Sequence, residues 1–145
     1  MTKQILSAMA LAATLLSLSA CMGNSIEISS VGDTMAYDKT LLEAKAGETV
    51  KLTLRNSAKS PAMLHNWVLI QPGSTDRVVM AALQAGQGKG YLPDGSPDVI
   101  AHTRLTNPGE SDTIEFKAPA TPGDYPFICT YPGHFSLMKG ILRVK

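Results

Sequence analysis

The stretch Val50-Lys51-Leu52-Thr53-Leu54-Arg55 decides the fold class, because apolar and polar residues alternate along its whole length. Successive side chains of a β-strand point to opposite faces, so this pattern predicts a strand with one buried and one solvated face. The same alternation recurs in Ile26-Glu27-Ile28, Thr113-Ile114-Glu115-Phe116 and Gly140-Ile141-Leu142-Arg143-Val144. Several short strands of this kind predict an all-β domain, built as an antiparallel sandwich.

Turn residues separate the predicted strands, at Ala46-Gly47-Glu48, Pro72-Gly73-Ser74, Asn107-Pro108-Gly109 and Thr121-Pro122-Gly123. One segment, residues 74–85, departs from the strand pattern. Ser74 can cap a helix there, and the residues that follow at helical spacing are Val78, Val79, Ala82 and Leu83. We therefore predict one short helix between strands, followed by a loop over residues 86–97.

The N-terminus has the composition of an export signal. Lys3 precedes an apolar run over residues 5–20, which is too short for a stable membrane span. The run ends in Leu18-Ser19-Ala20-Cys21, which resembles the lipobox of bacterial lipoproteins. This resemblance implies that residues 1–20 are a removed signal peptide and that residues 21–25 are a lipidated Cys21 with a short tether. Residues 26–145 then form a single domain.

Export predicts an oxidising compartment, the bacterial periplasm, with a lipid anchor in a membrane. Met22 stands where an Asp would indicate retention at the inner membrane, so the outer membrane is favoured. Two cysteines in such a compartment normally suggest a disulfide. A lipidated Cys21 has no thiol to pair, which leaves Cys129 free to bind a metal. The alternative is a Cys21–Cys129 disulfide, which would remove Cys129 from any metal site.

The charge of the chain argues against one class of partner. Residues 1–20 carry one Lys and no acidic residue, so removing them lowers the formal net charge from +1 to 0. Nucleic-acid binding needs a basic surface, and we therefore expect no nucleic-acid partner. Docking to protein partners should depend on shape and apolar contact.

The chemistry is concentrated in the loop Cys129-Thr130-Tyr131-Pro132-Gly133-His134-Phe135-Ser136-Leu137-Met138, which holds a thiol, an imidazole and a thioether. Two imidazoles and one thiolate in a trigonal plane, with a distant axial Met, form an electron-transfer copper site. A second imidazole must come from elsewhere. His65 is the better candidate because it opens a predicted strand, whereas His102 lies inside another, where an exposed or hydrogen-bonded histidine is the commoner outcome.

Three segments resemble azurins, which are small blue-copper cupredoxins: His65-Asn66-Trp67-Val68-Leu69, Val99-Ile100-Ala101-His102-Thr103, and residues 129–140. The resemblance runs over most of residues 21–145, with Gly32-Asp33-Thr34-Met35 and the helical insertion in the expected order. It implies an eight-stranded Greek-key cupredoxin β-sandwich with one short helical insertion. It also implies a type 1 (blue) copper protein that shuttles single electrons through one copper ion, Cu(I)/Cu(II), between redox proteins such as a cytochrome or a copper enzyme.

The resemblance assigns roles to individual residues. It implies that the equatorial copper ligands are His65, Cys129 and His134. It implies that Met138 is the weak axial ligand. Azurins carry a Gly before the first ligand histidine, and its carbonyl faces the copper. Leu64 stands there in this chain, so its backbone carbonyl should make a weak contact or none. Supporting residues around the ligands are expected at Asn66, Thr130 and Tyr131, and an exposed apolar docking patch at Met35, Met63, Pro132, Gly133 and Leu137.

Three other functions compete with electron transfer. A periplasmic copper carrier or chaperone would use the same ligands in an open, mobile site, which the rigid Pro132-Gly133 turn disfavours. A Cys–His hydrolase would need an oriented third group, and nothing in the sequence marks an oxyanion hole. A copper enzyme would need further imidazoles, yet only one of the three histidines remains after two are used. We therefore expect no enzymatic activity.

Trp67 is expected to pack in the core in preference to serving as an electron relay.

Overall fold

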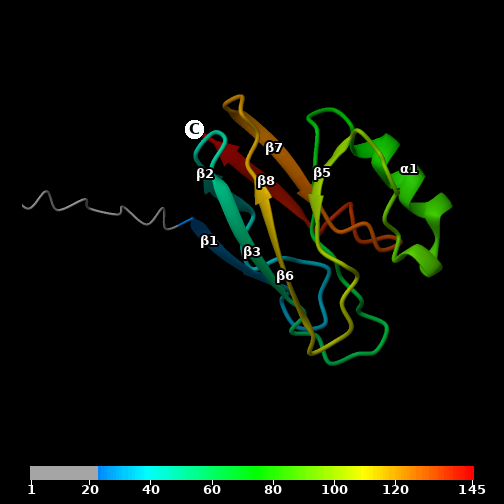
Figure 1. The fold of residues 1–145 in the computed structure, drawn as a ribbon. Coiled ribbons are helices and arrows are strands. Elements are labelled where there is room, and N and C mark those ends of the chain that lie inside the picture. The colour runs from blue at the N-terminus through cyan, green and yellow to red at the C-terminus, as the bar shows by residue number, and fades with distance from the viewer. Residues whose placement is uncertain (1–22) are drawn as a thin grey trace, which may run out of the picture.

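Eight strands form two sheets that pack face to face in the computed structural model, which describes residues 23–145 (Figure 1). The predicted signal peptide at residues 1–20, the lipidation site Cys21 and the adjoining Met22 lie outside the described residues. The prediction of an eight-stranded β-sandwich with one short helix is confirmed. The strands are β1 (Asn24–Ser29), β2 (Leu41–Ala44), β3 (Thr49–Arg55), β4 (Val68–Ile70), β5 (Val99–His102), β6 (Ser111–Lys117), β7 (Gly123–Ile128) and β8 (Lys139–Val144).

The two sheets have the strand orders β1-β3-β6 and β2-β8-β7-β4-β5. The expectation of a purely antiparallel sandwich is wrong, because β1 runs parallel to β3 and β2 runs parallel to β8. β1 and β2 follow one another in the sequence but belong to different sheets, so neither forms a hairpin with the other. Alternation of residues specifies which face of a strand is buried, and it does not specify the partner strand.

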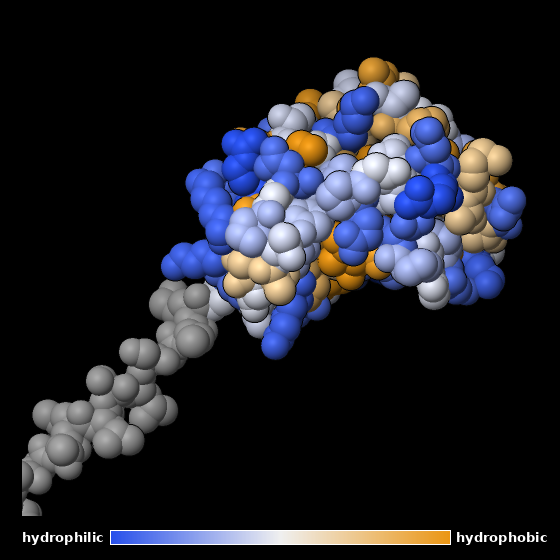
Figure 2. All heavy atoms as spheres, turned by 90° about the horizontal axis from the view of Figure 1, so that it is seen from above, coloured by the Kyte–Doolittle hydropathy of each residue, from blue (hydrophilic) through white to orange (hydrophobic). Residues whose placement is uncertain are grey.

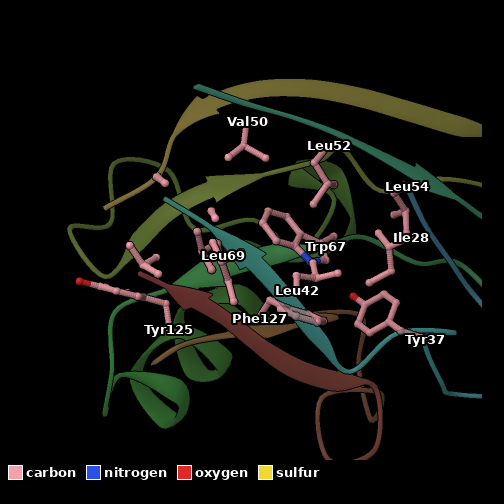
Figure 3. Packing of buried hydrophobic residues seen from close by; sticks show 14 of the residues in the cluster. Ile28, Tyr37, Leu42, Val50, Leu52, Leu54, Trp67, Leu69, Tyr125 and Phe127 are labelled. Atoms are coloured by element: carbon pink, nitrogen blue, oxygen red, sulfur yellow. The ribbon is translucent and has the colours of Figure 1, made fainter. Parts of the chain in front are cut away.

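The core lies between the sheets and contains the apolar face of the stretch that indicated the fold. Val50, Leu52 and Leu54 are fully buried, and they face side chains from the five-stranded sheet (Figure 3). The Trp67 ring is also fully buried and lies 5.7 Å from the rings of Phe116 and Phe127, which supports its core role. Burial of each such aliphatic side chain contributes about 1.5–3 kcal/mol to stability.

The solvent-facing residues of the strands are largely polar, as the alternation predicts. Lys51, for example, is exposed between the buried Val50 and Leu52. In Figure 2, which views the molecule from above Figure 1, hydrophilic residues predominate and small apolar patches lie between them. Within residues 23–145, no helix combines the length and the apolar character needed to cross a bilayer.

The helical insertion is α1 (Thr75–Ala85), which packs on the outer face of the five-stranded sheet, the face turned away from the other sheet (Figure 1). Its buried residues Val78 and Val79 pack on Val68, Ile70 and Ile128, so β4 is covered on both faces. Two details differ from the prediction. Leu83 is 46% exposed and does not join the buried face. Ser74 makes no side-chain cap, because its hydroxyl donates to the carbonyl of Gln71 at 2.6 Å. A 3₁₀ turn, η1 (Gln87–Lys89), follows in the predicted loop.

The first strand begins earlier than the domain boundary predicted at residue 26. Asn24 pairs with Val50 in the parallel ladder, and its side-chain amide donates to the carbonyl of Glu43 at 2.8 Å. Asn24 and Ser25, which the lipobox resemblance places in the tether, therefore belong to the sheet. The physical reason is that the parallel pairing with β3 continues to the first residues of β1 regardless of their polarity.

The order β8-β7-β4 brings the candidate ligands together. β7 pairs with β4 in the antiparallel direction, with Ile128 opposite Val68, so the last residue of β7 and the first residue of β4 lie at the same end of the sheet. Cys129 follows the last residue of β7, and His65 lies three residues before β4. The loop of residues 129–138 then connects to the start of β8 at that end of the sheet. The sheet thus fixes both ends of the loop and the segment that carries His65.

Candidate metal centre

Three donor atoms lie close together at this end of the sandwich. Nδ1 of His65 lies 3.2 Å from Nδ1 of His134, and Sγ of Cys129 lies 4.0 and 3.8 Å from these two nitrogens. Metal bonds of about 2.0–2.3 Å in a trigonal plane would place such donors about 3.5–3.8 Å apart. The three atoms therefore fit around one metal ion. One thiolate with two imidazoles is the donor set of electron-transfer copper sites.

The group is shielded from solvent. His65 and Cys129 are fully buried and His134 is 5% exposed. Burial disfavours the charged imidazolium and lowers the pKa of His65 to about 4, with a further contribution from His134. Burial also lowers the pKa of His134. Both imidazoles are thus neutral near pH 7, and their Nδ1 lone pairs are available to a metal.

The thiol of Cys129 depends on a metal for its ionisation. Burial raises its pKa to about 11, while the backbone N–H groups of Asn66 and Tyr131 act in the opposite direction by hydrogen bonding to the sulfur. A thiol with this pKa is protonated near neutral pH and is a poor nucleophile, which argues against a Cys–His hydrolase. A bound cation supplies the charge that stabilises the thiolate.

Asn66 joins the His65 segment to the ligand loop. Its side-chain amide donates to Thr130 Oγ1 at 2.8 Å, and its Oδ1 accepts the backbone N–H of Thr130 at 2.8 Å. Both residues are buried. This reciprocal pair ties the residue after His65 to the residue after Cys129, and both Asn66 and Thr130 were among the expected supporting residues.

Sequence reasoning missed the contribution of Tyr91. Its carbonyl accepts the Thr130 hydroxyl at 2.6 Å, and its ring lies 5.4 Å from that of Tyr131. Tyr131 in turn lies 4.8 Å from the His134 ring. Tyr91 has a φ of 53°, in the left-handed region that non-Gly residues rarely adopt. No local pattern in residues 86–97 signals these contacts, because they are made across the fold.

His65 is held by the neighbouring loop through its backbone. The N–H of His65 donates to the carbonyl of Thr106 at 3.2 Å, and the N–H and hydroxyl of Thr106 donate to the carbonyl of His65 at 2.8 and 2.7 Å. Asn56, which is almost fully buried, donates to the Thr106 carbonyl at 3.0 Å and to that of Met63 at 2.8 Å. The backbone that carries the imidazole is therefore fixed by several hydrogen bonds.

The ligand loop is closed by backbone bonds within its own length. The N–H of Cys129 donates to the carbonyl of Met138 at 3.0 Å, and the N–H of Met138 donates to the carbonyl of His134 at 2.8 Å. Gly133 adopts a φ of 83°, which a side chain would strain. Met138 is fully buried. These bonds place Met138 at the base of the loop, next to β8.

Other predicted residues lie around the group. His102 ends β5 with an exposed side chain, and its Nδ1 is 3.2 Å from the carbonyl of Thr103, so it lies outside the ligand group. Leu64 is half-buried beside His65. The predicted docking residues have different exposures: Leu137 is 65% exposed, Gly133 is exposed, and the half-buried members are Met35, Met63 and Pro132.

Comparison with known proteins gives a consistent result. The family model described as "Copper binding proteins, plastocyanin/azurin family" matches residues 24–145. Auracyanin-A of Chloroflexus aurantiacus is 41% identical over 122 residues, which cover 83% of this chain and 74% of that protein. An azurin of Bordetella pertussis is 36% identical over 149 residues, covering 99% of each chain. A solved structure of reduced auracyanin from Roseiflexus castenholzii has a TM-score of 0.78 at 38% identity, covering 84% of this chain and 97% of the other.

Proposed function

Because the chain belongs to the plastocyanin/azurin family of copper-binding proteins, we propose that it is a type 1 copper protein that carries single electrons between redox partners. The observation that carries this proposal is the buried triangle of His65 Nδ1, Cys129 Sγ and His134 Nδ1. A copper ion bound there supplies one-electron chemistry through its Cu(I) and Cu(II) states. The residues of the chain bind it, exclude water and keep its surroundings fixed.

Rigidity of the site supports electron transfer in preference to copper transport. Cu(I) and Cu(II) prefer different geometries, so a site that moves little on reduction favours fast transfer. The Asn66–Thr130 pair and the bonds between Thr106 and His65 hold the ligands from two sides. A carrier must open to release its metal, and burial of all three ligand side chains opposes this.

Two rates separate the shuttle from the carrier. We expect copper-loaded protein to exchange electrons between its oxidised and reduced forms much faster than it loses copper to a weak chelator. Line broadening in NMR spectra of mixed-valence samples measures the first rate, and chelator absorbance measures the second. Rapid copper loss together with slow electron exchange would favour the carrier.

The docking surface is proposed around the ligand loop. Leu137 is the most exposed large apolar residue among residues 23–145, and it lies three positions after the ligand candidate His134. Together with Met35, Met63, Pro132 and Gly133 it would form an apolar docking patch for a protein partner such as a cytochrome or a copper enzyme. Leu137→Lys should slow electron exchange, because a charge on each of two docking surfaces repels, whereas Leu83→Lys on α1 should not. Equal rates in both variants would contradict this location.

We propose that the protein is located in the bacterial periplasm and is anchored to a membrane by a lipid on Cys21. The outer membrane is favoured over the inner membrane. This rests on the signal-like residues 1–20 and the Leu18-Ser19-Ala20-Cys21 sequence. Mass spectrometry of the mature chain should find an acylated Cys21 as its first residue, and Cys21→Ser should move the protein from the membrane fraction to the soluble one. An unmodified Cys21 in the purified mature protein would overturn the anchor.

A further inference from the structure

Tyr37 belongs to the same buried core cluster as Cys129 and Met138. It lies in the connection between β1 and β2 and is 5% exposed. Its ring packs edge-on against Phe127 of β7, with centroids 5.5 Å apart. Its hydroxyl donates to the carbonyl of Asn66 at 2.5 Å. Among the described residues no other donor reaches that oxygen, so the phenol satisfies a polar group that burial would otherwise leave unpaired.

The residue that Tyr37 holds is the one that supports the sulfur. The Asn66 side chain forms the reciprocal pair with Thr130, which follows Cys129, and the Asn66 N–H lowers the pKa of Cys129 by hydrogen bonding to its sulfur. The Asn66 N–H and carbonyl belong to different peptide planes that meet at its Cα. The Thr130 pair fixes the Asn66 side chain, and the Tyr37 hydroxyl fixes its carbonyl, so two of the groups on this Cα are held and the N–H has little freedom to turn.

We propose that the Tyr37 hydroxyl is a positioning group for the metal centre, which aims the Asn66 N–H at Cys129 Sγ through its hydrogen bond to the Asn66 carbonyl. This deepens the proposed function, on which its redox consequence rests. Hydrogen bonds to a thiolate draw electron density away from the metal and favour the lower oxidation state. Loss of the phenol should therefore weaken the N–H contact to sulfur and favour Cu(II).

The chain contains a matched control at the other end of the sandwich. The hydroxyl of Tyr125 also donates to a backbone carbonyl, that of Thr121, at 2.9 Å, and Tyr125 is 8% exposed. Tyr37→Phe and Tyr125→Phe each remove one hydroxyl-to-carbonyl bond and keep the ring. Each should lower stability to a similar extent, so stability alone does not distinguish a positioning role from a structural one.

The first readout needs no copper. In ¹H–¹⁵N spectra of the metal-free protein, Tyr37→Phe should shift the amide protons of Asn66 and Thr130 and speed their hydrogen exchange, and Tyr125→Phe should leave them in place. Comparable shifts of these amides in both variants, or in neither, would overturn the proposal. This comparison holds even if the protein proves to have no electron-transfer role.

The second readout uses the copper-loaded full chain. Tyr37→Phe should move the Cu(I)/Cu(II) equilibrium about two- to tenfold towards Cu(II), the effect of weakening one hydrogen bond, where tenfold is 59 mV for one electron. The visible absorption band should shift in the same variant and stay in place in Tyr125→Phe. A Tyr37→Phe protein with reduced stability but unchanged potential, absorption and Asn66 amide would show that the phenol is merely structural.

Discussion

Nδ1 of His65 lies 3.2 Å from Nδ1 of His134, although the two residues are 69 positions apart in the sequence. The antiparallel pairing of β4 with β7 causes this proximity, since it brings the segment before β4 and the loop after β7 to the same end of the sheet. Two imidazoles this close cannot both carry a proton on Nδ1 without a clash between the donors. The arrangement is relieved when both lone pairs face one cation.

The metal-free protein should lose stability as the pH falls from 6.5 to 4. Burial lowers the pKa of His65 to about 4 in the folded state, from about 6.5 in the unfolded state. The unfolded state therefore binds the proton first, and the stabilisation present above pH 6.5 is lost as the pH falls through 4. The expected loss is on the order of 3 kcal/mol. Urea unfolding of metal-free protein across this range measures it.

The variant His65→Gln tests the acid prediction, because its stability should fall less steeply between pH 6.5 and 4 than that of the unaltered protein. A profile that is flat between pH 6.5 and 4 in the unaltered protein would contradict the burial argument for His65.

Gly140→Ala should destabilise the protein by about 3 kcal/mol, because β8 passes under the Phe127 ring at this point. A Cβ at residue 140 would collide with that ring and would lie 2.5 Å from the carbonyl oxygen of Thr40. That oxygen cannot withdraw easily, since it accepts the N–H of Ile141 at 2.8 Å. Urea unfolding of both proteins measures the difference.

The matched control is Gly88→Ala in η1, where a Cβ meets no atom within 4 Å. Its effect should stay within about 0.5 kcal/mol. Equal stabilities of the Gly140 and Gly88 variants would show that the close approach of β8 to Phe127 is wrongly placed.

Met138→Leu should keep the strong visible absorption of copper-loaded protein and raise its reduction potential. Met138 is proposed as a weak axial ligand, and removing a thioether lowers the coordination number, which favours Cu(I). The swap nearly conserves volume, so it should cost less than about 1.5 kcal/mol of stability. Cyclic voltammetry measures the potential. Met80→Leu, at an exposed position of α1, is the control and should change nothing. An unchanged potential in Met138→Leu would remove Met138 from the proposed ligand set.

The sequence predicted the parts of the fold that depend on local periodicity. Alternation in residues 50–55 identified a strand and its buried face, and helical spacing after Ser74 identified α1. β7 had no clear signal, because Pro126 interrupts its pattern. The structure tolerates this Pro for two reasons. Pro126 lies opposite Ile141 of β8, whose N–H is directed to the carbonyl of Thr40, and β4 pairs only with Phe127 and Ile128, so no partner strand needs the missing N–H. The parallel pairings were missed because partner choice is decided across the whole fold.

The candidate site was predictable where its residues are adjacent in the sequence. The loop of residues 129–138 contains a thiol and an imidazole at short spacing, and only His65 and His102 had to be considered for the second imidazole. The surrounding bonds were less accessible. Tyr91 and Tyr37 reach the site through backbone carbonyl and hydroxyl contacts that leave no trace in residue type or spacing.

The central claim is that Cys129, His65 and His134 bind one copper ion in a type 1 site. Titration of the purified mature protein with Cu(II), followed by visible absorption, tests it most directly. We predict an intense band that saturates at one copper per chain, caused by charge transfer from the Cys129 thiolate, and we predict its complete loss in Cys129→Ser while His102→Gln retains it. A colourless copper complex of the unaltered protein, or an intense band that survives Cys129→Ser, would contradict the account.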